Sequence, residues 1–168
     1  GYFSDTTEGM NELAGAAFSV ANQATSTFEL QAENTTSYGT FTSGTFTPVL
    51  TWSTLSTATS YSIGDAAADQ VDTTTLLDRL KQSEIGLLAS QTVTIEGFSD
   101  PQSAAALLIH NAALSVSYVV VRITLSNGER RIFRGMPSLP GESMSVGQKA
   151  TGSLTFAVKG KVGMLVSA

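Results

Sequence analysis

The side chains that could carry out chemistry in this chain are few and widely spaced. His110 is the only histidine and cysteine is absent, which excludes paired-histidine and thiolate metal sites. Serine is abundant, but no Gly-x-Ser-x-Gly turn presents a serine nucleophile for His110 to activate. We therefore interpret His110 as a structural side chain. The sequence predicts no catalytic residue, no cofactor and no metal ligand, and hence no enzyme.

Two further patterns approach known ligand sites without matching them. The run Gly160-Lys161-Val162 has valine where a phosphate-binding loop needs Ser or Thr to hold the metal ion. Asp65, Asp69 and Asp72 could hold a cation, but they do not have the spacing of a calcium loop, and a solvated acidic loop accounts for them. These three carboxylates are instead candidates for contacts between copies of the chain.

Charge is divided unevenly along the sequence. Residues 1–78 contain nine acidic side chains and no Lys or Arg, whereas residues 79–168 contain nine basic and five acidic ones, so the two parts carry −9 and +4. Chance clustering on solvated loops is one explanation. The other is that acidic and basic surfaces of neighbouring copies face each other, or that the acidic part lines a passage for another polyanion. A net charge of −5 argues against tight binding of nucleic acid, which depends on Lys and Arg.

The composition indicates a protein whose surface is largely covered by partners. Only 14% of residues are charged, against roughly 25% in an average soluble protein. No apolar run approaches the roughly 20 residues that span a bilayer, so we expect no membrane contact. The N-terminus has no basic segment followed by an apolar core, so we expect no signal peptide and synthesis in the cytoplasm.

A β-meander is predicted at the C-terminal end. Strand-like runs on either side of Asn127-Gly128 favour a type I′ hairpin turn, because both residues tolerate positive φ. A third run follows at 152–160. On the strand after the turn, alternation puts Arg130 and Arg134 on one face and Arg131 on the other. For these arginines a bridge to an acidic loop of a neighbouring copy, a phosphate contact and simple solvation all remain open.

One helix is predicted near residues 101–113. Ser99 or Asp100 can cap it and Pro101 suits its first position. The stripe expected to bury against a sheet consists of Ala104, Leu107, Leu108 and Asn111. Because the helix is apolar nearly all round, we expect it to be covered on more than one side.

The remaining segments predict strands and an N-terminal extension. Residues 1–15 are polar and are interpreted as a flexible N-terminal arm, and residues 16–168 as a single domain. Alternation over 91–97 predicts a strand, and Pro48 to Ile63 is the longest extended candidate in the N-terminal half. Residues 73–81 fit a helix or a strand. The fold class expected is mainly β (α+β), with β-sandwich or barrel-forming antiparallel sheets flanked by one α-helix.

Sequence motifs of the C-terminal half resemble those of a known family. Arg-Ile-x-x-x-Asn-Gly at 122–128 is followed by Phe-Arg-Gly at 133–135, Ser-Leu-Pro-Gly at 138–141 and Val-Lys-Gly-Lys-Val at 158–162. In order and spacing these motifs resemble the major tail tube proteins of long-tailed bacteriophages, whose fold is similar to that of type VI secretion tube proteins. The resemblance is best from Gln91 onwards, and the N-terminal half matches only in layout.

This resemblance implies a structural virion protein of the phage tail. Subunits would form homohexameric rings that stack into a conduit for DNA ejection, with barrel strands around 41–55 and 82–97 or 150–166. The stretch 56–81 would reach an adjacent ring, and the N-terminal arm would order on stacking. Implied partners are further copies of the chain, a tape-measure protein, tail terminator and tail tip proteins, and double-stranded DNA in transit.

Two other classes of function remain as rivals. The Thr-, Ser- and aromatic-rich residues 34–61 are compatible with a β-sandwich adhesin or carbohydrate-binding module. A small hydrolase with a nonstandard serine site would require His110 to matter.

Overall fold

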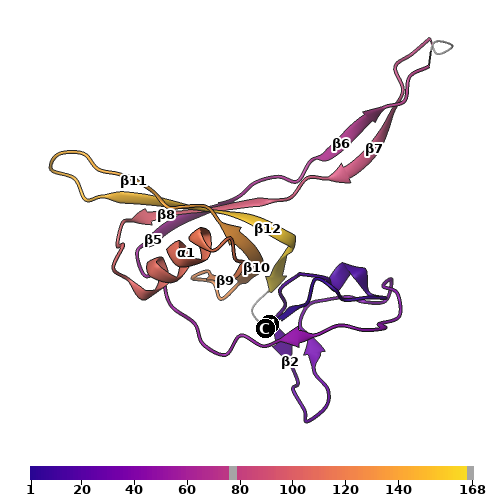
Figure 1. The fold of residues 1–168 in the computed structure, drawn as a ribbon, viewed down its shortest axis with the longest axis horizontal. Helices are drawn as coiled ribbons and strands as arrows, with labels where there is room; N and C mark the ends of the chain where they lie inside the picture. The colour runs from indigo at the N-terminus through magenta and orange to yellow at the C-terminus, as the bar shows by residue number, and fades with distance from the viewer. Residues whose placement is uncertain (76–78, 166–168) are drawn as a thin grey trace.

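A curled antiparallel sheet organises the molecule (Figure 1). In this computed structural model, which describes residues 1–75 and 79–165, the six-stranded sheet has the order β5-β8-β12-β10-β9, with β11 beside β12. The bounds are β5 (Ala58–Ile63), β8 (Thr92–Phe98), β9 (Val119–Thr124), β10 (Arg130–Pro137), β11 (Gly141–Ser143) and β12 (Thr151–Leu165). The predicted mainly β fold is confirmed, and so is the meander, because β10 pairs antiparallel with both β9 and β12.

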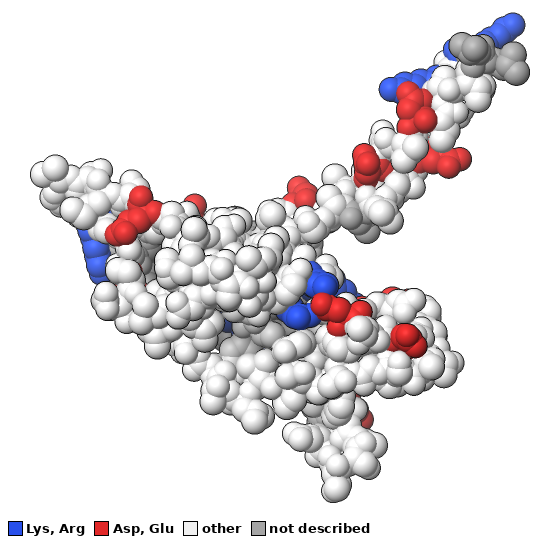
Figure 2. Space-filling view, in the orientation of Figure 1, with Lys and Arg blue, Asp and Glu red and all other residues white. Residues whose placement is uncertain are grey.

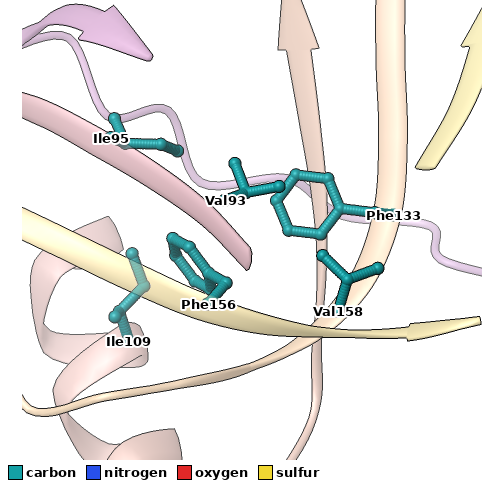
Figure 3. Packing of buried hydrophobic residues seen from close by; sticks show 6 residues of the cluster. All are labelled: Val93, Ile95, Ile109, Phe133, Phe156 and Val158. Carbon is teal, nitrogen blue, oxygen red and sulfur yellow. The ribbon is translucent and has the colours of Figure 1, made fainter. Parts of the chain in front are cut away.

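The main core lies between the sheet and the one α-helix of the described residues, α1 (Ala104–Leu114). Alternate residues of neighbouring strands supply Val93, Phe133 and Phe156, none of which is exposed to solvent. Figure 3 shows these side chains converging, with Ile109 of the helix on one side of the group. The Phe133 and Phe156 rings meet edge to face with centroids 5.8 Å apart, an arrangement that aromatic quadrupoles favour.

The helix begins later and is rotated relative to the prediction. Its N-cap is Ser103, whose side chain accepts a hydrogen bond from the Ala106 amide, so neither Ser99 nor Asp100 caps it. The buried residues are Ala105, Ile109 and Ala112, one position along from the stripe predicted at Ala104 and Leu108. The apolar residues surround the helix, so the pattern alone could not decide which side faces the sheet.

The β9–β10 hairpin forms where predicted but with a different turn. Among the described residues Gly128 has φ +86°, whereas Asn127 is not in the positive-φ region. The Gly128 amide donates to the Leu125 carbonyl, and the Leu125 amide donates to the Glu129 carbonyl. The loop therefore has three residues, in the pattern of a type I turn followed by a G1 bulge at Gly128. The type I′ prediction was wrong because the register of β9 and β10 leaves three residues in the loop, not the two of a type I′ turn.

Residues 1–47, here called the N-terminal unit, build a second small core from short elements. These are β1 (Tyr2–Phe3), the 3₁₀ turn η1 (Asn11–Leu13), β2 (Val20–Ala21), β3 (Glu29–Leu30) and β4 (Phe46–Thr47). Strand β1 pairs with β4, and β2 with β3. Phe3, Leu13 and Phe18 are buried together, and the Phe3 ring lies edge-on to both Phe18 and Phe46.

The first fifteen residues are part of this packing. The Gly1 ammonium group donates to the Phe18 carbonyl, and Phe3 and Leu13 are 7% and 3% exposed. The N-terminal unit lies against the face of the sheet opposite α1, where Ala17 packs on Ile132 of β10. Ordering of residues 1–15 upon stacking stays a prediction.

A long hairpin projects from the sheet (Figure 1). Strands β6 (Ala68–Asp72) and β7 (Ser83–Leu88) pair antiparallel as a two-stranded ribbon. They continue β5 and β8, and the Gly64 amide bonded to the Thr92 carbonyl links the two stretches. We call residues 64–91 the projecting hairpin. The predicted helix or strand over 73–81 includes residues 76–78, which lie outside the described residues, and its described part belongs to neither.

The extended segment predicted from Pro48 to Ile63 is shorter in the structure. Only Ala58–Ile63 is a strand, while residues 48–57 have no strand partner and are largely exposed. Of the barrel-wall candidates, 41–55 contains only the short β4, whereas 82–97 contains β7 and most of β8. The run of β-branched, aromatic and small residues over 48–57 was therefore not sufficient for a strand. Among the described residues, its backbone bond to the sheet is made at its last position, where the Thr57 carbonyl accepts from the Phe98 amide of β8.

Candidate functional site

The sheet has two margins that lack a further strand in the described chain. Strand β5 pairs with β8 alone and β9 with β10 alone, so each presents backbone amide and carbonyl groups outward. Unpaired strand edges promote pairing with other chains unless they are covered. The structure thus has the open margins that a ring of subunits can complete.

Asp65, Asp69 and Asp72 all lie on the projecting hairpin. Figure 2 shows acidic side chains along its length and basic ones toward its far end. Asp69 and Asp72 belong to β6 and Asp65 precedes it, and all three are exposed. They are spread along β6 and the residues before it rather than gathered around one point. They therefore form an acidic row and not a cation site.

Asp72 is tied locally within the hairpin. Its carboxylate accepts hydrogen bonds from the Thr74 hydroxyl and amide and lies 3.5 Å from the Lys81 ammonium. The hydrogen bonds from Thr74, then that from Lys81, hold the pKa of Asp72 below its usual value. At neutral pH the carboxylate is therefore charged, and it is partly balanced by Lys81.

The projecting hairpin also exposes large apolar side chains. Val71 is 52% exposed, and Leu80, Ile85 and Leu87 are 78, 83 and 88% exposed. An isolated two-stranded ribbon is only marginally stable in water, and exposed aliphatic residues lower its stability further. Sequence reasoning identified the carboxylates of this segment as contact candidates but did not predict that Val71, Ile85 and Leu87 are exposed.

The three arginines of β10 divide between local contacts and solvent. Arg131 lies 3.2 Å from the Glu129 carboxylate, which precedes it on the same hairpin. Arg130 is exposed. Arg134 instead reaches the N-terminal unit, where it donates to Asp5 at 2.7 Å and stacks on the rings of Tyr2 and Tyr118.

Asp5 joins the N-terminal unit to the sheet. Its second carboxylate oxygen lies 2.8 Å from the Lys159 ammonium of β12, so one carboxylate is shared by Lys159 and Arg134. The hydrogen bond from Lys159, followed by that from Arg134, lowers the pKa of Asp5 although partial burial opposes the shift. Charged groups far apart in sequence therefore fix this contact.

A second contact of the same kind involves Lys161. Its ammonium group donates to the Glu33 carboxylate and, at 3.0 Å, to the Tyr38 hydroxyl. Burial would lower the pKa of Lys161, but its bonds to Glu33 and Tyr38 prevail and raise it. The −9/+4 asymmetry is thus used partly inside one subunit, where acidic groups of the N-terminal unit face basic groups of β10 and β12.

An apolar groove lies beside the start of α1, and sequence reasoning missed it. It has a volume of about 560 Å³. Its lining includes Leu55, Leu107, Leu139 and Leu154, and acidic residues Glu96, Asp100 and Glu142 also border it. Leu107 and Leu139 are 46 and 59% exposed, so the groove opens to solvent. His110 also lines it and is exposed. We call this the α1 groove.

Within the described residues no group of His, Asp and Glu side chains is placed to hold a metal ion. The helix that the structure describes is too short to cross a membrane.

The comparisons with known proteins give one family match and solved structures with a similar fold. The family described as phage tail tube protein matches residues 8–167. The structure is similar to that of a chain in the tail of an empty GTA particle with C6 symmetry, at 16% identity and a TM-score of 0.50, covering 68% of this chain and 85% of that one. It is also similar to a chain in the virion of a native gene transfer agent particle, at 14% identity and a TM-score of 0.52, covering 67% and 88%. No curated protein matches the sequence.

Proposed function

The chain belongs to the phage tail tube protein family and is a structural component of the virion tail, and from this we propose that six copies close into a ring and that rings stack into the tube. The observation that carries the proposal is the family match over residues 8–167. The sixfold symmetry is supported by the tail whose chain has a similar fold. The open margins at β5 and β9 give each subunit a backbone edge for its neighbours.

The role we propose is mechanical rather than enzymatic. The tube would enclose a tape-measure protein during assembly, meet terminator and tip proteins at its ends, and conduct double-stranded DNA. A net charge of −5 supports passage without tight binding, because phosphate contacts are made by Lys and Arg. The adhesin alternative is not favoured, because the family match includes the Thr-, Ser- and aromatic-rich residues 34–61 on which it rested.

Electron microscopy of the purified protein tests the proposal. At increasing protein concentration, negative-stain images are expected to show rings with sixfold rotational averages and then striated tubes. A protein that stays monomeric at millimolar concentration, in sedimentation and in images, would contradict it.

A further inference from the structure

Residues 48–57, here called the strap, connect the two open margins of the curled sheet. The guanidinium carbon of Arg122, in β9, lies 4.5 Å from the centre of the Trp52 ring, and the chain then enters β5 at Ala58. At about 3.3 Å per residue, the stretch from Trp52 to Ala58 spans at most roughly 20 Å. Figure 1 shows the strap running from the N-terminal unit past β9 to β5. It therefore bridges the opening between the margins.

The strap also passes from one face of the sheet to the other. Arg122 shares its side of β9 with Val120, which packs against Ile132 on the face turned to the N-terminal unit. Leu55 instead packs against the main core, on the face covered by α1. A chain can change faces only by passing round a margin of the sheet. The contact between Trp52 and Arg122 places that passage at β9.

A cavity of about 660 Å³ lies between the strap and β9. Its lining includes strap residues 51–55 and every residue of β9 from Val119 to Thr124. Because successive residues of a strand point to opposite faces, a cavity lined by all of them follows the edge of the strand. Among the described residues, no backbone hydrogen bond joins the strap to β9. The strap thus covers this margin without pairing with it.

Resting on the proposed function, we infer that the strap is a latch that blocks the β9 margin in the free subunit and must leave Arg122 before a neighbouring copy pairs there. Trp52 is 39% exposed, and its main electrostatic partner is the guanidinium beside its ring, a cation–π contact. When only the open form can bind, the apparent affinity falls by the fraction of subunits that are open. The latch therefore delays ring closure until subunits are concentrated.

Substitution of Trp52 tests the latch through the onset of assembly. Trp52→Ala should lower the protein concentration at which rings first form by roughly two- to tenfold, because the cation–π contact is lost. Trp52→Phe keeps an aromatic face for Arg122 and should behave like wild type. Leu50→Ala, in the same strap, removes a side chain that is 85% exposed and should also match wild type. Sedimentation and negative-stain images measure the onset, and circular dichroism checks the fold.

Two results of this series overturn the inference. If Trp52→Ala needs more protein than wild type, or the same amount, the strap does not block the margin. If Leu50→Ala shifts the onset as far as Trp52→Ala, the effect does not come from the contact with Arg122.

Cross-linking holds the strap closed, because the chain has no cysteine of its own. In Trp52→Cys/Arg122→Cys, a short reducible bis-thiosulfonate linker joins the strap to β9 within one subunit. The linked protein is expected to stay monomeric and to form rings after reduction. The matched control is Asn22→Cys/Glu29→Cys, whose native side chains are hydrogen-bonded at 2.6 Å beside the β2–β3 pair. The control should form rings whether linked or reduced.

The cross-linking result separates the latch from the proposed function. Failure of the Trp52→Cys/Arg122→Cys protein to link as a free subunit, or ring formation by the linked protein at the wild-type concentration, overturns the latch alone. Loss of rings in both linked proteins overturns it as well, because the block is then not specific to β9. If wild-type protein forms no rings at any concentration, the proposed function itself fails, and this inference with it.

Discussion

Gly128 shows how a single backbone angle fixes the β9–β10 hairpin. At φ +86° it occupies a region of backbone conformation that is unfavourable for residues with a Cβ and most unfavourable for β-branched residues. The hairpin holds Phe133 in the main core and Arg134 against the N-terminal unit, so its geometry reaches both cores.

Substituting Gly128→Val should therefore destabilise the subunit by about 1–3 kcal/mol, because the strained conformation is retained or the loop is rebuilt. Urea unfolding followed by circular dichroism measures the effect. Asn127→Ala is the matched control: it loses a side-chain bond to the Glu129 amide but no positive φ, and should cost less. Equal stability of Gly128→Val and wild type would contradict the turn described here.

Asp5 carries a pH dependence of defined sign. Its pKa is lowered in the folded protein by Lys159 and Arg134, so the folded state favours the charged carboxylate. The resulting stabilisation is present above the unfolded pKa, near pH 4, and is lost as pH falls through the lower folded pKa.

Asp5→Asn should accordingly reduce stability at about pH 6 and have a smaller effect at about pH 3, because protonation of Asp5 in the unfolded state below pH 4 already reduces the contribution of the charged carboxylate. Denaturant midpoints at the two pH values measure this. Glu12→Gln, another exposed acidic position of the N-terminal unit, should leave the difference between the two pH values near that of wild type. A parallel response of both variants would argue against the Asp5 contact.

Local sequence identified β8, β9, β10, β12 and the helix, but not how single residues pair. The alternation at β8 and the runs around Asn127-Gly128 involve neighbours in sequence, so their elements could be predicted. The bond between Arg134 and Asp5 joins residues 129 positions apart, and no local pattern encodes it. For the same reason the sequence left open whether the arginines of β10 bridge to a neighbouring copy, contact phosphate or are solvated, whereas Arg134 is engaged within the subunit.

At the scale of elements, α1 shows that composition alone does not predict which side of a helix is buried. Its boundary depends on a side-chain bond at Ser103, and its buried side depends on where the sheet lies. Leu107, Leu108 and Leu114 are 46, 49 and 62% exposed in the subunit. The expectation that α1 is covered on more than one side therefore remains a prediction about the assembled tube.

Ser103→Ala should lower stability by about 1 kcal/mol, because the Ala106 amide loses its capping acceptor. Asp100→Ala is the control, since the Asp100 carbonyl that accepts from Ser103 belongs to the backbone and is unchanged. Thermal melts followed by circular dichroism compare them. If Asp100→Ala lowers stability and Ser103→Ala does not, the helix starts at the position first predicted from sequence.

At the scale of the whole molecule, the projecting hairpin gives each subunit a reach far beyond its sheet. Carboxylates lie along its length and cations toward its far end, where Lys81 contacts Asp72 (Figure 2). Opposite charges on a facing copy fix orientation and register, even where they add little affinity.

Reversing Asp65, Asp69 and Asp72 together to Lys should weaken ring stacking, because the acidic row would become basic and the new side chain at position 72 would repel Lys81. Tube length and yield by negative-stain microscopy are the measurements, and a salt series shows whether the loss is electrostatic. Replacing three exposed threonines of the same hairpin, Thr73, Thr74 and Thr75, by Ser provides a control that changes no charge. Unchanged tubes in the reversed variant would remove these residues from the stacking contact.

The placement of β8 between β5 and β12 has a consequence for the order of folding. Thr94 of β8 meets Thr155 of β12, 61 residues later in the chain, whereas the β9–β10 hairpin closes locally. Pairings of long sequence separation form slowly. During synthesis at about 5–20 residues per second, the apolar side of β8 waits roughly 3–12 s for its neighbour to emerge. We expect nascent chains of this protein to depend on chaperone protection during that interval, before any ring can form.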